Sequence, residues 1–476
     1  MRYFSKTLMG LFVAMLCFGL GACSNDNEPE MNQEKSETHT IPMEFIGNVI
    51  GFDSQSGPSH APSRATTSSW SSGDKIYLTF YNGTNKVSGE ATYSSSSGWK
   101  VTFDGNLATG SSLKCEARYF VNATFQSSSL VSLNANSEIY EDLNGKYTYN
   151  SGSLTVQATL SPKTGRLRFK GSSGAKIYLT GISYYTTFSP GINAFSSSNA
   201  MISATVASSG YTPYIYGTFA DSDRNIGLVG SNFAFTRTGT SEMLKAGASG
   251  YMAIPSESSH NSWRSGLFVK AGGVEFKMIP VTGYSGGFYL IGETEVTTAL
   301  YYSVNGSSSS LQTPIDNVSY PSIESFIEKL NNATMLNFAL PTLAQWKYAA
   351  KGGSKSQNYT YAGSNTPGDV AWYSANCSSK QNVKTKAPNE LGIYDMSGNV
   401  AEFAKPDGTS SYPNICGGAY LSPSGHITAS YSCTTDQCCD YGTPTYDWYW
   451  DYSYRSYTST NCKKSGIGFR LILTCP

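Results

Sequence analysis

Short alternating runs of apolar and polar residues dominate the first half of this chain and limit what it can fold into. Between Ile41 and Lys270, glycine and serine interrupt runs such as KIYLTFYNG, WKVTFDGN, GRLRFKG and AKIYLTG. A period of two places successive side chains on opposite faces of an extended strand. The 13% aromatic content and the 47 glycines suit many short strands joined by turns. The pattern therefore predicts β structure over this half.

Chain length sets the number of domains. At roughly 150 residues per domain, 476 residues suggest about three. We expect the alternating region to form two tandem β-sandwich domains, at residues 41–160 and 161–271.

The pattern changes over residues 272–476, where helical spacing appears. In SIESFIEKLNNA, apolar residues from Ile323 to Leu330 recur at i, i+3, i+4 and i+7, with Ser322 placed as a cap. Thr342 and Gln345 have the spacing of a capping box. This part of the chain is therefore expected to be a mixed α+β domain.

The N-terminus has the features of an export signal. Arg2 and Lys6 precede an apolar run that is too short to span a membrane as a helix. The run ends in Leu-Gly-Ala-Cys, which resembles the bacterial lipobox, so we predict a signal peptide at 1–22 and lipidation at Cys23. Residues 23–40 are polar and acidic and are expected to form a disordered tether. The chain is thus predicted to be lipid-anchored at the outer membrane of a Gram-negative bacterium and exposed on its surface.

Charge and cysteine content narrow the function further. Lys plus Arg equals Asp plus Glu, at 33 each, so no net field favours nucleic acid, and that partner is excluded. Seven of the 10 cysteines lie in the last hundred residues. In an exported protein these favour disulfides, with at least one cysteine left over. A zinc cluster is the alternative, but no paired C-x2-C spacings are present.

Six motifs occur in a fixed order over the last roughly 200 residues: FYLIGETEVTTALYYSVNG, FALPTLAQWKYAAKGG, AWYSAN, APNELGIYDMSGNVAEF, GGAY and GIGFRLIL. Their order and spacing resemble the formylglycine-generating enzyme family, also called sulfatase-modifying factors. The resemblance implies a compact α+β fold related to C-type lectins. Members oxidise a sulfatase cysteine, perform other oxidative chemistry, or bind ligands without catalysis.

The residues that the family uses for oxidation are replaced in this chain. Active members hold copper with two cysteines after the Gly-Gly motif, and the resemblance places these positions at Ser422 and Ile427. Neither side chain can bind Cu(I), so we expect no copper and no formylglycine generation. His426 is the one histidine of the C-terminal region, so no iron site is expected either. Cys433 and Cys438 keep the separation of the catalytic pair in another register, and an insertion that moved a working pair there is the alternative.

The resemblance also implies a structural calcium site in YDMSGNVAEF. The corresponding ligands are Asp395 and Glu402 by side chain, and Gly398 and Val400 by main-chain carbonyl. Hard oxygen ligands suit calcium. The alternative is that both carboxylates are solvated loop residues.

A dense aromatic segment follows the Gly-Gly motif, in the region where this family has loops over its binding face. Flat rings can stack on sugars, and nearby aspartates accept hydroxyl hydrogen bonds. The same alternation would also suit one buried strand face. The predicted glycan-binding residues are Tyr446, Asp447, Trp448, Trp450 and Tyr452.

The strand IPMEFIGNVI followed by SRATTSSWSSGDKIYLTF resembles the start of fimbrillin-like lipoproteins, which build pili. In that family a trypsin-like protease cuts after an arginine in the loop behind the first strand, and Arg64 is the matching residue. The alternative is an exposed arginine with no role in processing. The resemblance also implies fimbrial subunits as partners.

Together these features predict a surface adhesin or fimbria-associated, tip-like protein. Its C-terminal head is expected to be catalytically inactive and to bind a glycan or a host-surface ligand. An active oxidoreductase and a purely structural pilus subunit are the alternatives.

The lipid anchor gives a direct test. Cys23→Ala removes the thiol that receives the lipid, so the variant should leave the membrane fraction and enter the aqueous phase on detergent phase separation. A variant that still partitions with detergent would contradict the anchor.

Overall fold

The structure is a computed structural model of the chain. It describes residues 37–52, 70–127, 130–255, 262–405, 413–434 and 465–475. Thr38–Pro476 form one compact unit, separate from Met1–Glu37. Among the described residues, no helix is long and apolar enough to cross a membrane. The predicted signal peptide, Cys23 and Arg64 lie outside the described residues.

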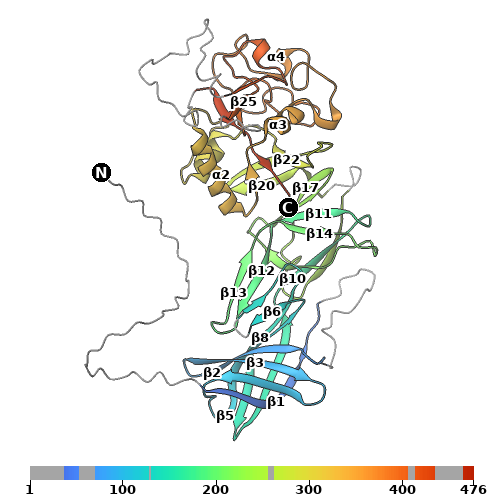
Figure 1. Cartoon of the computed structure of the whole chain (residues 1–476), viewed down its shortest axis with the longest axis vertical. Helices are drawn as coiled ribbons and strands as arrows, with labels where there is room; N and C mark the ends of the chain where they lie inside the picture. The colour runs from blue at the N-terminus through green and yellow to red at the C-terminus, as the bar shows by residue number, and fades with distance from the viewer. Residues whose placement is uncertain are drawn as a thin grey trace, which may run out of the picture. The chain divides into compact units, whose positions relative to one another are not determined.

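The first domain is a closed barrel in the order β1-β4-β3-β2-β5-β8-β9 (Figure 1). Trp99, Val101 and Val156 are among the buried side chains that fill it. Its strands are β1 (Thr38–Val49), β2 (Lys75–Asn82), β3 (Asn85–Ser94), β4 (Gly98–Asp104), β5 (Gly110–Val121), β8 (Glu138–Asn150) and β9 (Ser153–Pro162).

Barrel closure corrects the expectation of an open sandwich at 41–160. The first half of β1 pairs antiparallel with β4 up to Met43, and its second half pairs parallel with β9 up to Val49. One long strand thus covers both edges of the sheet, which removes the edges that a sandwich would leave. A period of two gives inward and outward faces in either architecture, so the sequence pattern could not distinguish them.

The second domain consists of two sheets that share one buried cluster, which includes Phe169, Leu179, Ile215 and Leu228. The first sheet contains β18 (Ser249–Ala253), β10 (Gly165–Lys170), β15 (Ile215–Phe219), β12 (Ile182–Ser189), β7 (Leu130–Ser132) and β6 (Thr124–Ser127), with β13 (Ala194–Ser198) on β12. The second contains β14 (Ile202–Thr205), β11 (Lys176–Thr180), β16 (Asn225–Gly230), β17 (Phe233–Thr238) and β19 (Arg264–Ser265). Because β6 and β7 precede β8 in the chain, the second domain borrows two strands from within the expected range of the first.

The C-terminal domain has two small sheets and short helices. One sheet is β20 (Leu267–Ala271), β21 (Val274–Val281), β22 (Tyr289–Gly292), β28 (Ile472–Leu473) and β23 (Phe338–Ala339). The other is β26 (Ser432–Thr434), β25 (Asn414–Cys416), β24 (Ala401–Ala404) and β27 (Ile467–Phe469). The helices are α1 (Thr298–Val304), α2 (Tyr320–Thr334), α3 (Leu343–Ala350), α4 (Pro367–Val370) and the 3-10 turns η2 (Gly353–Lys355) and η3 (Ser424–His426). Since β20 joins the first of these sheets, the domain starts a few residues before the expected 272.

The two expected helices are present. In α2, Ile323, Phe326 and Leu330 form the buried face, but the N-cap is Ser319 and not Ser322, because Tyr320 and Pro321 already belong to the first turn. In α3 the capping box is complete: the Thr342 Oγ1 accepts from Gln345 N at 3.2 Å, and the Gln345 Oε1 accepts from Thr342 N at 2.9 Å.

Candidate functional site

The loop that carries the predicted calcium ligands is held in a tight left-handed conformation. Asp395, Gly398 and Asn399 have φ values of 58°, 76° and 56°. A Cβ on Gly398 would lie 2.2 Å from the Trp372 carbonyl oxygen, so only glycine fits at this close approach. The loop leads directly into β24, which places Glu402 in the interior of the domain.

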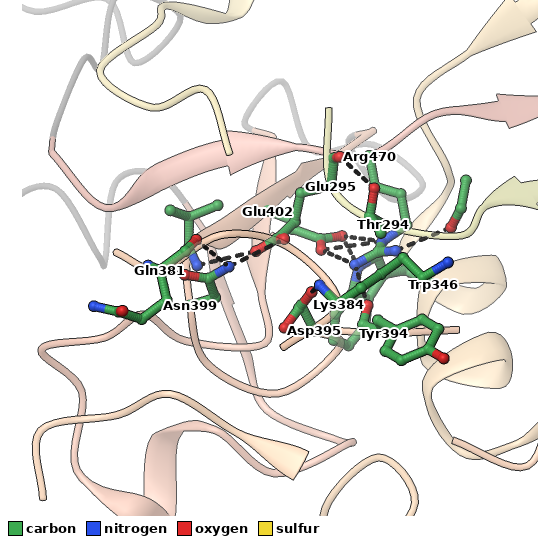
Figure 2. Close-up of polar contacts among 12 residues, drawn as sticks. Thr294, Glu295, Trp346, Gln381, Lys384, Tyr394, Asp395, Asn399, Glu402 and Arg470 are labelled. Carbon is green, nitrogen blue, oxygen red and sulfur yellow. Dashed lines mark hydrogen bonds and ion pairs between the residues drawn. The ribbon is translucent and has the colours of Figure 1, made fainter. Parts of the chain in front are cut away.

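Glu402 is paired with an arginine that is completely buried. Arg470 is 0% exposed and Glu402 is 1% exposed. The Arg470 Nη2 lies 2.7 Å from Glu402 Oε1, and its Nε lies 3.1 Å from both carboxylate oxygens. Figure 2 shows the two side chains facing each other. This fork geometry is the strong form of an arginine–carboxylate pair.

The remaining hydrogen-bonding groups of this pair are also satisfied. The Trp346 indole N–H donates to Glu402 Oε2 at 2.6 Å. Arg470 donates through Nη1 to the Gly292 carbonyl and through Nη2 to the Tyr394 carbonyl, both at 2.9 Å. A buried ion pair is stable only when such groups are satisfied, so the cluster joins α3, β22, β24 and the 394–400 loop into one unit.

Two further carboxyl groups lie close to this pair. Glu295 is 1% exposed and accepts from Val400 N at 3.2 Å and from Asn399 Nδ2 at 3.3 Å. Asp395 is 4% exposed; its Oδ2 accepts from Lys384 N at 2.9 Å, while its Oδ1 has no partner within the described part of the chain. With Glu402 there are three carboxyl groups around a single guanidinium group.

The pKa values of two of these carboxyl groups are raised. Burial raises the pKa of the Asp395 carboxyl to about 6, against the opposing hydrogen bond from Lys384 N–H. Burial, followed by the neighbouring Asp395 carboxylate, raises the pKa of Glu295 well above its ordinary value. Desolvation disfavours the charged form of each group.

Glu402, one of the calcium ligands expected from the sequence, is engaged by protein groups in this structure. Both Glu402 oxygens accept from Arg470 and Trp346, so the guanidinium group takes the place that a cation would have. No group of three or more His, Cys, Asp or Glu side chains suited to a metal occurs within the described ranges. The calcium assignment of Asp395, Gly398, Val400 and Glu402 stays a prediction, and we derive no step through a bound cation.

The two positions that correspond to the copper cysteines have other roles. Ser422 Oγ accepts from Ala419 N at 2.9 Å and so closes the turn after the Gly-Gly motif. Ile427 is 0% exposed and packs in a small cluster with Val370 and Ala371. A turn-closing hydroxyl and a core side chain occupy these two positions.

Several predicted residues cannot be placed. The segment with Tyr446, Asp447, Trp448, Trp450 and Tyr452, and also Cys438, lies outside the described residues. Cys433 is described only by its backbone, which pairs with Ile415 in the β25–β26 ladder. In the predicted disulfide region, Cys377 and Cys475 are free thiols, and the expected disulfides stay a prediction.

Sequence reasoning missed Glu295 and the role of Arg470. The GIGFRLIL motif does indicate a buried role for Arg470, because this one arginine interrupts an apolar strand pair. A charged residue in such a run must find a buried partner. For Glu295 no local pattern indicates burial, because its partners Asn399 and Val400 lie about a hundred residues away in the chain.

The raised Asp395 pKa predicts a pH-dependent gain of stability in Asp395→Asn. The folded state binds the proton more tightly than the unfolded state, so this contribution is present below about pH 4 and is lost as pH rises through about 6. The variant should match wild type at pH 4 and be more stable by about 1–3 kcal/mol at pH 8, measured by denaturant unfolding.

The matched control is Asp369→Asn, which changes an exposed aspartate of the same domain. It should leave the pH profile unchanged. A gap between Asp395→Asn and wild type that is independent of pH, or a loss of stability at pH 8, would refute the assignment.

Comparison with known proteins gives three findings about parts of the chain. Among curated proteins, the chaperone protein LppX of Paenibacillus barcinonensis is 48% identical over 84 residues, which cover 14% of this chain and 30% of that relative. The chain thus spans less than a third of the relative's length. Among solved structures, variable protein 1 of Treponema denticola is 23% identical, covering 44% of this chain and 98% of its own, with a TM-score of 0.35. A fimbrial protein from Bacteroides ovatus ATCC 8483 is 10% identical, covering 61% of this chain and 77% of its own, with a TM-score of 0.25.

The family comparison agrees with the ordered motifs of the C-terminal part. The match begins at residue 266, just before β20, and ends at 474, just after β28, so it covers both sheets and the Arg470–Glu402 cluster. The resemblance to sulfatase-modifying factors is therefore confirmed for this part of the chain: residues 266–474 match the model of the sulfatase-modifying factor enzyme 1-like domain.

Proposed function

We propose that this chain is a lipid-anchored, surface-exposed binding protein, an adhesin or a fimbria-associated tip-like protein. Its sulfatase-modifying-factor-like head binds a ligand such as a glycan and does not oxidise a substrate thiol. The tether after Cys23 would hold the domains away from the membrane.

The observation that carries this proposal is the use of the two copper-cysteine positions for packing. Ile427 is buried against Val370 and Ala371, and the Ser422 hydroxyl is hydrogen-bonded within its own turn. Copper-dependent oxidation needs two thiolates that converge on one open position. A buried aliphatic side chain offers neither a ligand nor an open position, so this part of the head supports binding in place of catalysis.

The described residues that flank the aromatic segment support the proposal of a binding loop near the Gly-Gly turn. The second sheet of the head has the order β26-β25-β24-β27, so the chain leaves from one edge strand at Thr434 and returns at the other edge strand at Ile467. Gly466 N donates to Asp316 Oδ2 at 2.8 Å, and a Cβ on Gly466 would touch Ala419 and the Tyr420 ring. Gly466, close behind the aromatic segment in the chain, therefore lies beside the Gly-Gly turn.

The first domain supports fimbrial subunits as partners. Arg64 lies in the connection between β1 and β2, and β1 closes the barrel by pairing with β4 and β9. After a cut at Arg64, β1 would be held by backbone pairing and side-chain packing alone. A strand held in this way can be exchanged for a strand of another subunit.

The binding proposal predicts that glycan binding depends on the aromatic rings of Trp448 and Trp450. If Trp448 and Trp450 stack on a sugar, replacing both with alanine in the whole protein should weaken binding on a glycan array at least tenfold, as stacking energies of about 1 kcal/mol per ring imply. Tyr302→Ala is the matched control, because this tyrosine is 43% exposed on α1. It should leave glycan binding unchanged.

Two outcomes would overturn the proposal. If the double variant loses its cooperative melting transition, the two rings are part of the core. If the whole protein with copper and a reductant produces an aldehyde on a sulfatase-motif peptide, and Cys433→Ser abolishes it, the head is an oxidase.

A further inference from the structure

Three cationic side chains lie on one face of β10 in the second domain. Leu167 and Phe169 point into the buried cluster between the two sheets. Because side chains alternate along a strand, Arg166, Arg168 and Lys170 share the opposite face. Lys170 is exposed and Arg168 is partly exposed, whereas Arg166 is only 8% exposed.

Aromatic rings hold the two arginines in place. The Arg168 guanidinium carbon lies 4.4 Å from the ring centre of Tyr211 and 4.7 Å from that of Tyr214. The Arg166 guanidinium carbon lies 4.0 Å from the Tyr214 ring centre. Stacking of this kind fixes a guanidinium group without using its hydrogen-bond donors.

Neighbouring strands add polar groups to the same face. The register pairs Arg166 with Ser249 and Arg168 with Tyr251 on the edge strand β18. Arg166 Nε donates to Ser249 Oγ at 3.0 Å. This hydrogen bond holds the Arg166 guanidinium group against the Tyr214 ring. Tyr251 is 46% exposed and places an aromatic side chain beside Arg168.

Arg168 and Lys170, the two more exposed cations of this face, have no acidic partner in the part of the chain that the structure describes. Within the described residues, no carboxylate lies within ion-pair distance of Arg168 or Lys170, whereas Lys75, Arg118 and Lys163 each have one. The Arg168 Nε is buried and has no hydrogen-bond partner among the described residues. A stacked, partly exposed guanidinium group beside an exposed lysine, with no carboxylate of its own, is a site for an anionic group.

We propose that this face of β10, formed by Arg168, Lys170, Tyr211, Tyr214 and Tyr251, binds an acidic polysaccharide through its sulfate or carboxylate groups. Residues i and i+2 of a strand are about 7 Å apart, so Arg168 and Lys170 can contact successive charges of a linear polyanion. The site lies in the second domain, so it does not depend on the function proposed for the head.

The chemistry of the rings favours a polysaccharide over nucleic acid. Both guanidinium groups already lie over Tyr214, and Arg168 also covers Tyr211. For the stacking of bases this face offers only Tyr251, whose ring meets Tyr211 edge-on. Sulfate and carboxylate groups need only donors and positive charge, which this face provides.

The test measures binding of the whole protein in detergent to immobilised heparin, with dextran as the uncharged control. Wild type should bind heparin and not dextran, with an affinity that falls as salt rises. Arg168→Gln/Lys170→Gln should weaken binding about tenfold or more. The matched control is Lys100→Gln/Lys146→Gln, which removes two exposed cations from the barrel and should retain binding within about twofold.

Lys170→Glu changes a side chain outside the arginine–tyrosine stack, because Lys170 is exposed at the end of β10. It should also weaken heparin binding about tenfold, with an unchanged melting temperature. The proposal fails if wild type does not bind heparin or if the barrel control loses binding equally. It also fails if polyglutamate or single-stranded DNA displaces heparin at equal charge concentration, since the partner would then be an acidic peptide or a nucleic acid.

Discussion

The buried ion pair between Arg470 and Glu402 is the interaction on which the C-terminal domain depends. Arg470 lies between β27 and β28, which belong to different sheets, and its carboxylate partner lies in β24. Its other donors reach the Gly292 and Tyr394 carbonyls. Loss of one partner from such a pair leaves an uncompensated buried charge, which costs about 3–5 kcal/mol. A single side chain therefore ties both sheets to the loop at 394–400.

The buried charge cluster lies next to the Gly-Gly turn, because a Cβ on Gly417 would touch the ring of Trp346, which donates to Glu402. The charge cluster is inside, and the Gly-Gly turn with Ser422 and Tyr420 lies next to Gly466, close behind the aromatic segment in the chain. Ile427, at the position that the resemblance assigns to a copper cysteine, is part of the core.

The elements that depend on local pattern could be predicted from the sequence. The face of α2, the capping box at Thr342 and the β character of the first two domains follow from spacing alone. Features that depend on distant contacts could not: closure of the barrel by β1, the assignment of β6 and β7 to the second domain, and the partner of Glu402. The family pattern placed Glu402 at a metal site, and only the fold shows that Arg470, 68 residues later, occupies its two oxygens.

The most direct test of this account is the melting of the C-terminal domain with calcium and with chelator, in wild type and in Arg470→Met. If the guanidinium group holds the domain together, chelator leaves the wild-type transition unchanged. Arg470→Met should lose about 3–5 kcal/mol because Glu402 is left buried without its partner. A wild-type transition that falls on chelation, together with an Arg470→Met variant as stable as wild type, would contradict the account.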